Sequence, residues 1–354
     1  MSPESRIQGG IRLKILAVRN DRLGDFMLAW PALQMLAKNL PEAEVSVLVR
    51  DYTAPLAGFC KGVTTVFPDP GVAGEFGSAR AIARLVRGER FDAALAFFSR
   101  FDTALGLALA RIPIRAAPAT KLAQVFYTHR LRQRRSRSVK PEYVYNLELA
   151  EYFLSLLGVT EPVQPKSPYL TFPPGEILAV RRGLAARLGF DSSRPLVFMH
   201  PGHGGSSPQP PPALFAQIGR ALEVEGAELV LTEGLADVEA VAELRRVLGD
   251  VPHAVYRSRA GLADFARHLA AADLFISGST GPLHIAGALD VPTVAFYPRR
   301  RSATALRWQT LNSDKHRLAY MPPASAGESD FTALDFEQVA VEVVGFMKRV
   351  TKNA

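Results

Sequence analysis

The stretch FISGSTGPLHIAGALDVPTVAFYP, residues 275–298, decides the fold class of this chain. Its pattern predicts a buried strand, a small polar loop, a helix and a second strand. Ser279 or Thr280 can cap the helix, and Pro282 is tolerated in the first turn, where its missing N–H has no helical partner. Gly281 lets another group approach the backbone closely. The free N–H groups and the positive dipole end predict an anion site that fits a diphosphate, although an ordinary capped helix has the same pattern.

Short apolar strands alternate with helical stretches along the chain, and this alternation is typical of parallel sheets in doubly wound α/β domains. The expected strands are short apolar runs, at 15–18, 45–49, 92–98, 195–200 and 228–232. The expected helices are 26–38, 212–224 and 236–248. Because the pattern restarts after its midpoint, we expect two similar domains. Two such domains that face each other would place the carboxyl ends of both sheets on a central cleft, where ligands of open α/β sheets bind.

The segment VQPKSPYLTFPP, residues 163–174, has four prolines in twelve residues and predicts the linker between the domains. Near the end of the chain, apolar residues at helical spacing predict a last helix with one buried face; they are Phe336, Val339, Val343 and Met347. The expected divisions are an N-terminal acceptor domain (1–162), the linker (163–174), a C-terminal nucleotide-sugar domain (175–332) and a C-terminal helix (333–354). We expect that helix to return to the N-terminal domain.

The composition is that of a globular protein. The 354 residues are 48% apolar and 21% charged, a composition that indicates neither a disordered chain nor a membrane protein. No apolar run approaches the ~20 residues that span a bilayer, and the first residues lack a signal-peptide pattern, so we expect a cytoplasmic protein. The single cysteine, Cys60, excludes an internal disulfide and a cysteine metal cluster, and its apolar context predicts a core position. No Asp-x-Asp pair is present to carry Mg²⁺ or Mn²⁺, so no metal and no cofactor are expected.

The net charge of +8 indicates an anionic partner, and much of it is concentrated in RLRQRRSRSVK, residues 130–140. This segment holds six basic residues and no acid. It is either a solvated loop or a docking strip for a phosphorylated substrate, anionic lipid headgroups or nucleic acid. Nucleic acid is not expected, because the segment lacks a binding motif and interleaved aromatic residues. The candidate acceptor-binding residues in this strip are Arg132, Arg134, Arg135 and Arg137.

In the first domain, the loop NDRLGD (20–25) directly follows the first strand. Gly24 permits a tight approach, and Asp25 stands where the helix is expected to begin. Asp25 is either a helix cap or a general base that takes a proton from an acceptor hydroxyl, and spacing alone does not separate these roles. Asp21 is a weaker candidate on the same loop. Arg22 could bind an acidic group of the acceptor.

In the second domain, the loop HPGHGGSS (200–207) also follows a strand and offers backbone N–H and hydroxyl donors to an oxyanion. Its candidate donor-binding residues are Gly202, Gly204, Gly205, Ser206 and Ser207. The loop only loosely matches the dinucleotide fingerprint, because Ser207 stands at the third glycine and a run of prolines delays the helix. We interpret His200 and His203 as hydrogen-bonding residues rather than metal ligands.

Two further sets of charged side chains are expected near a bound nucleotide. Glu233, at the end of the next strand, could hold ribose hydroxyls or face solvent. Without a metal, a leaving diphosphate would be neutralised by helix ends and by cations such as Arg299, Arg300 or Arg301.

The motifs NDRLGDFMLAWPAL, HPGHGGSS and STGPLHIAGALDVPTVAFYP together resemble glycosyltransferase family 9, the heptosyltransferases of lipopolysaccharide core assembly. The segments at 141–159 and 261–278 extend the resemblance over nearly the whole chain. It implies the GT-B fold of two Rossmann-like domains and a metal-independent transfer with inversion at the sugar carbon. By the motif match, Asp25 takes the family's catalytic base position. Thr280, Gly281 and His284 take its donor diphosphate loop, with Ser279 and Pro282 beside them.

The resemblance also implies the substrates: heptose from ADP-heptose, and a lipopolysaccharide-core or similar glycolipid acceptor met at the cytoplasmic face of the inner membrane. Many members carry an aspartate directly before the Thr-Gly pair, where this chain has Ser279. That aspartate is tied to recognition of the heptose, so a different nucleotide sugar stays open. Three further activities stay open as well: a nucleotide-sugar epimerase of the same architecture, a dehydrogenase that uses the glycine loop, and a non-catalytic binding protein.

Overall fold

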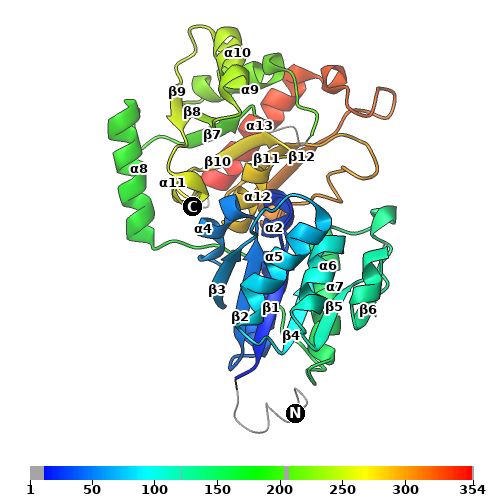
Figure 1. The fold of residues 1–354 in the computed structure, drawn as a ribbon. Coiled ribbons are helices and arrows are strands. Elements are labelled where there is room, and N and C mark those ends of the chain that lie inside the picture. The colour runs from blue at the N-terminus through cyan, green and yellow to red at the C-terminus, as the bar shows by residue number, and fades with distance from the viewer. Residues whose placement is uncertain (1–11, 121, 203–206, 353–354) are drawn as a thin grey trace. The chain divides into compact units, whose positions relative to one another are not determined.

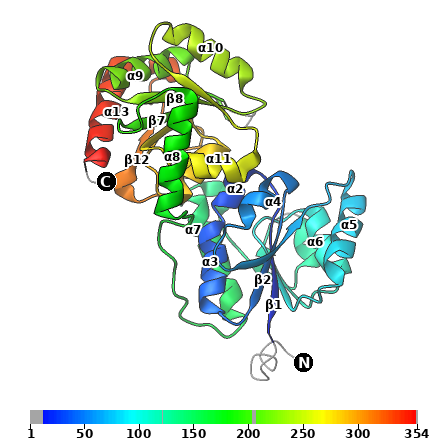
Figure 2. The same ribbon diagram turned by 90° about the vertical axis from the view of Figure 1, so that its left-hand side faces the viewer.

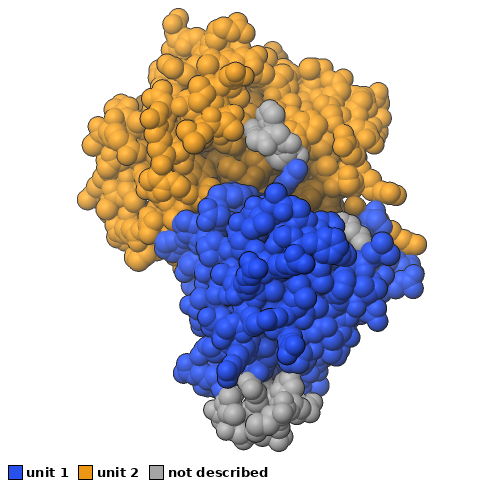
Figure 3. Space-filling model, in the orientation of Figure 1, with its two compact units in different colours: residues 1–136, 140–169 blue, residues 137–139, 170–354 orange. Residues whose placement is uncertain are grey.

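The computed structural model describes residues 12–120, 122–202 and 207–352 (Figure 1). The chain divides into unit 1, residues 1–136 and 140–169, and unit 2, residues 137–139 and 170–354 (Figure 3). The change from one unit to the other after Tyr169 falls inside the segment that was predicted as the linker. Among the described residues, no helix is long and apolar enough to cross a bilayer.

Unit 1 is built on a six-stranded parallel sheet in the order β3-β2-β1-β4-β5-β6. Its strands are β1 (Lys14–Arg19), β2 (Glu44–Val49), β3 (Val63–Pro68), β4 (Ala93–Ala96), β5 (Ile114–Pro118) and β6 (His129–Leu131). Its helices are α2 (Leu23–Met27), α3 (Trp30–Asn39), α4 (Ala54–Ala57), α5 (Glu75–Arg87), α6 (Phe101–Leu109) and α7 (Glu142–Ser155). Short 3₁₀ turns are η1 (Asp51–Thr53), η2 (Leu122–Phe126) and η3 (Arg135–Arg137). Figure 2 shows the sheet between α3 and α7 on one face and α5 and α6 on the other.

Buried strands explain why this sheet forms. β1 and β4 contribute Leu16, Val18, Ala94 and Ala96 to a core that α5 and α6 cover, and each of these side chains is almost fully buried. A strand buried on both faces reads as a continuous apolar run, which is what the sequence showed. Cys60 is also buried, so its predicted core position is confirmed; burial raises the pKa of its thiol.

The helix predicted at 26–38 is two helices. α2 ends at Met27, and α3 begins at Trp30 with Pro31 in its first turn. Pro31 lacks the N–H that would bond to the Met27 carbonyl in a continuous helix, but a proline is tolerated in the first turn of a new helix. The break therefore separates the short α2, which carries Asp25, from the buried α3.

Unit 2 repeats the architecture with a six-stranded parallel sheet in the order β12-β11-β10-β7-β8-β9. Its strands are β7 (Leu196–His200), β8 (Glu228–Glu233), β9 (Ala254–Arg257), β10 (Leu274–Gly278), β11 (Thr293–Phe296) and β12 (Arg317–Tyr320). Its helices are α8 (Pro174–Leu188), α9 (Pro212–Val224), α10 (Val238–Leu248), α11 (Gly261–Leu269), α12 (Gly281–Ala288) and α13 (Phe336–Thr351), with 3₁₀ turns η4 (Asp314–His316) and η5 (Phe331–Ala333). The predicted α/β class with two doubly wound domains is confirmed.

The C-terminal helix α13 packs in unit 2, against α9. Val339, Val343 and Met347 are buried in the core that the strands of unit 2 share with α9 and α10. The predicted buried face is therefore confirmed, whereas the predicted return to the N-terminal domain is wrong. The physical reason is that the apolar stripe of α13 completes the cover over its own sheet.

Candidate active site

The carboxyl end of β1 is the centre of the site in unit 1. The sheet order reverses between β1 and β4, and ligands of open α/β sheets bind at such a switch point. Arg19 is the last residue of β1, and its Nη1 donates to the carbonyl oxygen of Phe97, just beyond β4, at 3.2 Å. A cation therefore stands at the switch point.

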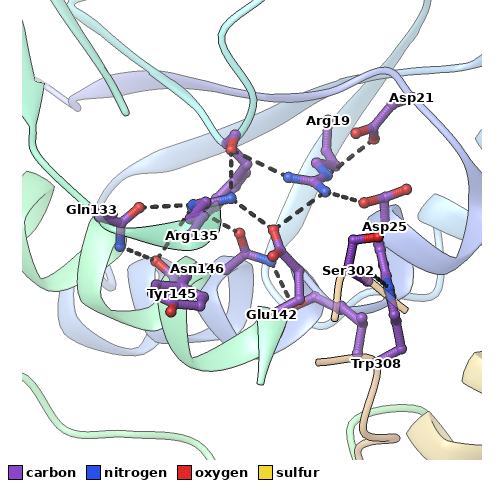
Figure 4. Close-up of polar contacts among 12 residues, drawn as sticks. Arg19, Asp21, Asp25, Gln133, Arg135, Glu142, Tyr145, Asn146, Ser302 and Trp308 are labelled. Atoms are coloured by element: carbon purple, nitrogen blue, oxygen red, sulfur yellow. Dashed lines mark hydrogen bonds and ion pairs between the residues drawn. The ribbon is translucent and has the colours of Figure 1, made fainter. Parts of the chain in front are cut away.

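Three carboxylates surround the guanidinium of Arg19, whose side chain is only 2% exposed (Figure 4). Its Nε lies 3.0 Å from Asp21 Oδ1, and its Nη2 lies 2.5 Å from Asp25 Oδ1. Glu142 Oε1, from the first residue of α7, is 3.7 Å from the same Nη2. The loop after β1 and the start of α7 thus meet on one buried cation.

Arg135 joins this cluster from the other side of Glu142. Its Nη1 lies 2.7 Å from Glu142 Oε1 and donates to the carbonyl of Phe97 at 3.2 Å, and its Nε donates to Gln133 Oε1 at 3.0 Å. Its guanidinium stands 5.8 Å from the centre of the Tyr145 ring. Arg135 was predicted in the acceptor-binding strip, and its side chain is 13% exposed and turned toward Glu142 and the Phe97 carbonyl. These contacts give Arg135 a structural role, and its binding to the acceptor stays a prediction.

The cluster holds two guanidinium groups and three carboxylates, so one negative charge is left over when all are ionised. Burial raises the pKa of Asp21 to about 6; Arg19 lowers this pKa and Asp25 raises it. For Arg19 itself, burial acts to lower the pKa, but attraction to Asp21, Asp25 and Glu142 outweighs burial and raises it. The guanidinium therefore stays charged.

Asp25 does not cap a helix. Arg22 holds the N-cap position of α2, and Asp25 lies inside the helix with its carboxylate turned to Arg19. The Asp25 side chain is 18% exposed, which leaves it within reach of a substrate. The cap interpretation is therefore wrong, and the role of general base stays a prediction.

Most of the predicted acceptor-binding arginines lie at the surface. Arg22, Arg132, Arg134 and Arg137 are exposed, unlike Arg135. Arg137 belongs to unit 2, and the other three belong to unit 1.

In unit 2, the loop after β7 begins with a close contact that requires glycine. A Cβ on Gly202 would lie 2.0 Å from Asp237 Oδ1, and the carboxylate of Asp237 accepts from the Gly234 N–H at 3.1 Å. His200 Nδ1 shares a 2.9 Å hydrogen bond with Thr232 Oγ1, so its predicted hydrogen-bonding role is confirmed. The predicted Ser207 is partly buried. Four predicted loop residues lie outside the described residues: His203, Gly204, Gly205 and Ser206.

The helix start predicted as an anion site is α12. Thr280 stands at the N-cap position, and its hydroxyl bonds to Ser277 Oγ at 2.9 Å. Within the described part of the chain no side chain caps this helix, so the capping expected from Ser279 or Thr280 is not seen. Gly281 and Pro282 form the start of the first turn. The N–H groups of this turn are therefore not taken by a side-chain cap, as an anion site requires.

His284 is buried on α12 and meets Trp308 edge to face, with ring centroids 6.2 Å apart. Trp308 is itself fixed, because its Nε1 donates to the Ser302 carbonyl at 2.9 Å. These contacts place the imidazole of His284 about one turn after the N-terminus of α12.

Glu233 and Arg299 are engaged by neighbours. Glu233 ends β8 and lies 2.9 Å from Arg257 Nε. Arg299 donates to the carbonyls of Ala324 and Ala326 at 3.1 and 3.0 Å, whereas Arg300 and Arg301 are exposed. Of the three predicted cations, Arg299 is thus bonded to the loop that contains Ala324 and Ala326.

In residues 12–120, 122–202 and 207–352, no group of three or more His, Cys, Asp or Glu side chains is placed to hold a metal ion. The expectation that the protein needs no metal or cofactor stays a prediction.

Sequence reasoning missed Arg19, Glu142 and Asp237. A signal existed for Arg19, because a charged residue that ends an apolar strand must find a partner when buried. For Glu142 the only signal in the sequence was its position in the first turn of a helix, where acidic residues are common. Nothing in the local sequence indicated that Asp237 packs on Gly202.

Comparison with known proteins adds independent findings. The model of glycosyltransferase family 9 (heptosyltransferase) matches residues 79–318. A Haemophilus influenzae protein named "Putative glycosyltransferase" is 38% identical over 344 residues, which cover 96% of this chain and 99% of that protein. Lipopolysaccharide heptosyltransferase 2 of Salmonella typhimurium is 25% identical over 295 residues, 80% of this chain and 82% of that one. The structure of Escherichia coli ADP-heptose lipopolysaccharide heptosyltransferase II has the same fold, with a TM-score of 0.78, 20% identity, and coverage of 97% and 100%.

Proposed function

Because the chain belongs to glycosyltransferase family 9, the heptosyltransferase family, we propose that this glycosyltransferase moves a sugar from a nucleoside diphosphate to a hydroxyl of a lipopolysaccharide-core or similar glycolipid. The Salmonella relative is named for heptose transfer to lipopolysaccharide, and the Escherichia coli enzyme of the same fold is named for ADP-heptose. ADP-heptose is therefore the first donor to test. A different nucleotide sugar is the alternative, since Ser279 supplies a hydroxyl where many members carry an aspartate.

The observation that carries this proposal is the carboxylate of Asp25, partly exposed and fixed by Arg19 at the carboxyl end of β1. In the proposed step, Asp25 accepts the proton of the acceptor hydroxyl as that oxygen bonds to the anomeric carbon. The bond from this carbon to the diphosphate oxygen breaks, and its electron pair leaves with the nucleoside diphosphate. Attack opposite the leaving group inverts the anomeric configuration.

Arg19 orients the base without neutralising the site. The guanidinium of Arg19 contacts the carboxylates of Asp21 and Glu142 as well as that of Asp25. One positive charge therefore orients the Asp25 carboxylate without cancelling the negative charge of the three carboxylates. A base fixed in this way needs no reorganisation when the acceptor arrives, and general bases contribute about 10²–10⁴-fold to rate.

The donor diphosphate is proposed to bind at the start of α12. The N–H groups around Gly281 and the positive end of the helix dipole would stabilise the negative charge of the leaving group, with His284 nearby. This arrangement would provide the charge stabilisation that a metal ion supplies in other transferases, so no metal or cofactor is part of the proposal.

The acceptor is proposed to bind to unit 1. The exposed guanidinium groups of Arg22, Arg132 and Arg134 could pair with acidic groups of the glycolipid. Arg137, which is grouped with unit 2, stays a separate candidate. A glycolipid acceptor would be met at the membrane surface, on the cytoplasmic face of the inner membrane. Nucleic acid is not a proposed partner.

Asp25→Asn tests the base, with Asp21→Asn as its matched control on the same loop. Release of nucleoside diphosphate is measured with a panel of nucleotide sugars, with and without acceptor, and donor binding by thermal stabilisation. We expect Asp25→Asn to lower kcat by about 10²–10⁴-fold and leave donor binding intact, with a much smaller loss for Asp21→Asn. Near-normal turnover by Asp25→Asn would remove the base assignment.

The same assay tests the competing activities. Conversion of the donor without any acceptor would identify the epimerase. The family assignment sets aside the dehydrogenase and the non-catalytic binding protein, because both lack sugar transfer.

A further inference from the structure

An exposed apolar surface lies on unit 1 where α5, α6 and η2 meet. We call it the apolar patch, and its residues are Val72, Phe76, Phe101, Leu122, Val125 and Phe126. The Phe76 side chain is 63% exposed and Leu122 is 86% exposed. Figures 1 and 2 show α5 and α6 side by side on one face of the sheet. Monomeric soluble proteins rarely expose large contiguous apolar surfaces without an interaction to serve.

The patch is continuous although its residues come from separate segments. The rings of Phe76 and Phe101 meet edge to face with centroids 5.5 Å apart, and Phe101 meets Phe126 in the same way at 5.5 Å. Val72 lies beside α5, because its Cγ1 is 3.2 Å from the place of a Cβ on Gly77. Three rings in contact therefore connect α5 to η2.

The conformation of η2 turns two large apolar side chains outward. In a 3₁₀ turn, residues three apart lie on the same side. Ala123 is buried in the core beneath α6, whereas Leu122 and Val125, three apart, are both exposed. The side chains of Leu122 and Val125 are therefore not part of the core of unit 1.

Arginines surround the patch. Arg80 and Arg84 follow Phe76 at four-residue spacing on α5 and are exposed on the same helical face. Arg130 on β6 pairs in register with Ala117, a core residue on the sheet face that α6 covers, so Arg130 lies on the face that carries the patch. Glu75 is an exposed acid beside Phe76, so cations outnumber acids around the patch.

We propose that the apolar patch and its arginines dock unit 1 on an anionic lipid bilayer. Phe76, Leu122 and Val125 enter the boundary between headgroups and acyl chains, and the arginines pair with lipid phosphates. Each arginine near an anionic surface adds roughly fivefold to affinity, and a small apolar insertion gives reversible binding. The arginines around the apolar patch favour an anionic bilayer as its binding partner. The further statement that this docking serves sugar transfer rests on the proposed function.

The test is co-sedimentation of the full-length protein with vesicles of phosphatidylcholine, with and without phosphatidylglycerol. The test variant combines Leu122→Ser and Val125→Ser. The control is Val224→Ser, which replaces an exposed valine at the end of α9 in unit 2. We expect the double variant to bind anionic vesicles at least about tenfold more weakly and the control to bind as the wild type does. Arg130→Gln should weaken binding roughly fivefold on anionic vesicles only.

Three outcomes would overturn the proposal. The first is wild-type binding that is equal on both vesicles, and the second is binding that survives the double variant. The third is self-association in solution that the double variant abolishes, which would make a second copy of the chain the occupant. A water-soluble acceptor separates this proposal from the proposed function: turnover on it should be unchanged in the double variant, and a failure of sugar transfer would leave vesicle binding as it is.

Discussion

Replacing Glu142 by Gln removes the negative charge that two buried arginines share. Glu142 Oε1 lies 2.7 Å from Arg135 Nη1 and 3.7 Å from Arg19 Nη2, and both arginines also donate to the carbonyl of Phe97. Without the charge, Arg135 is left beside neutral acceptors such as the Phe97 carbonyl and Gln133 Oε1, whereas Arg19 still pairs with Asp21 and Asp25. Loss of one partner of a buried ion pair costs about 3–5 kcal/mol, and the amide of Gln can restore about 1 kcal/mol as a hydrogen bond.

We therefore expect Glu142→Gln to lower the free energy of unfolding by about 2–4 kcal/mol. For a unit of this size the melting temperature should fall by on the order of 10 °C. Thermal and urea unfolding followed by circular dichroism measure the loss. Turnover should fall much less than stability, because Arg19 keeps its contacts with Asp21, Asp25 and the Phe97 carbonyl, and donor binding in unit 2 should not change.

The matched control is Glu75→Gln. Glu75 is the first residue of α5, as Glu142 is of α7, but it is exposed. It should lose only its interaction with the helix dipole, about 0.3–1 kcal/mol. Equal losses for the two variants would refute the argument that Glu142 holds the arginines. As a further check, Glu142→Leu combined with Arg135→Met should be more stable than Glu142→Gln, because apolar pairs replace buried ion pairs well.

Two further predictions concern Asp21 in unit 1 and Gly202 in unit 2. Burial raises the pKa of Asp21 from 3.8 to about 6, so between these pH values the folded protein keeps a proton that the unfolded chain releases. The free energy of unfolding should therefore decrease as pH rises from about 4 to 6. Asp21→Asn should remove this pH dependence, as measured by urea unfolding. Gly202→Ala should displace Asp237 and destabilise unit 2 by about 1–3 kcal/mol, whereas Gly183→Ala, in the interior of α8 with no atom within 4 Å of its Cβ, should stabilise it by up to about 1 kcal/mol. No pH slope in the wild type, or equal melting temperatures for the two alanine variants, would contradict these predictions.

Local patterns in the sequence were enough to predict the two α/β domains and the loops that carry the candidate site. Apolar runs of strand length, helical spacing and glycine or proline at turns are properties of neighbouring residues, and most of the elements that they predict are present in the structure. The buried face of α13 and the core position of Cys60 belong to the same class. Where a local pattern failed, as in the helix predicted at 26–38, the cause was again local, since Pro31 in the first turn of α3 cannot continue the helix from α2.

The tertiary structure alone decided which charges meet and which helix covers which sheet. In the basic strip the sequence offers equivalent arginines, yet Arg135 turns inward because α7 brings Glu142 to it. The same packing places Glu142 on Arg19, and the apolar stripe of α13 fits α9 in its own unit. A sequence pattern specifies that a face is apolar or that a charge needs a partner. The choice among partners depends on side chains far apart in the chain, and their desolvation and pairing energies exist only once the strands and helices have packed.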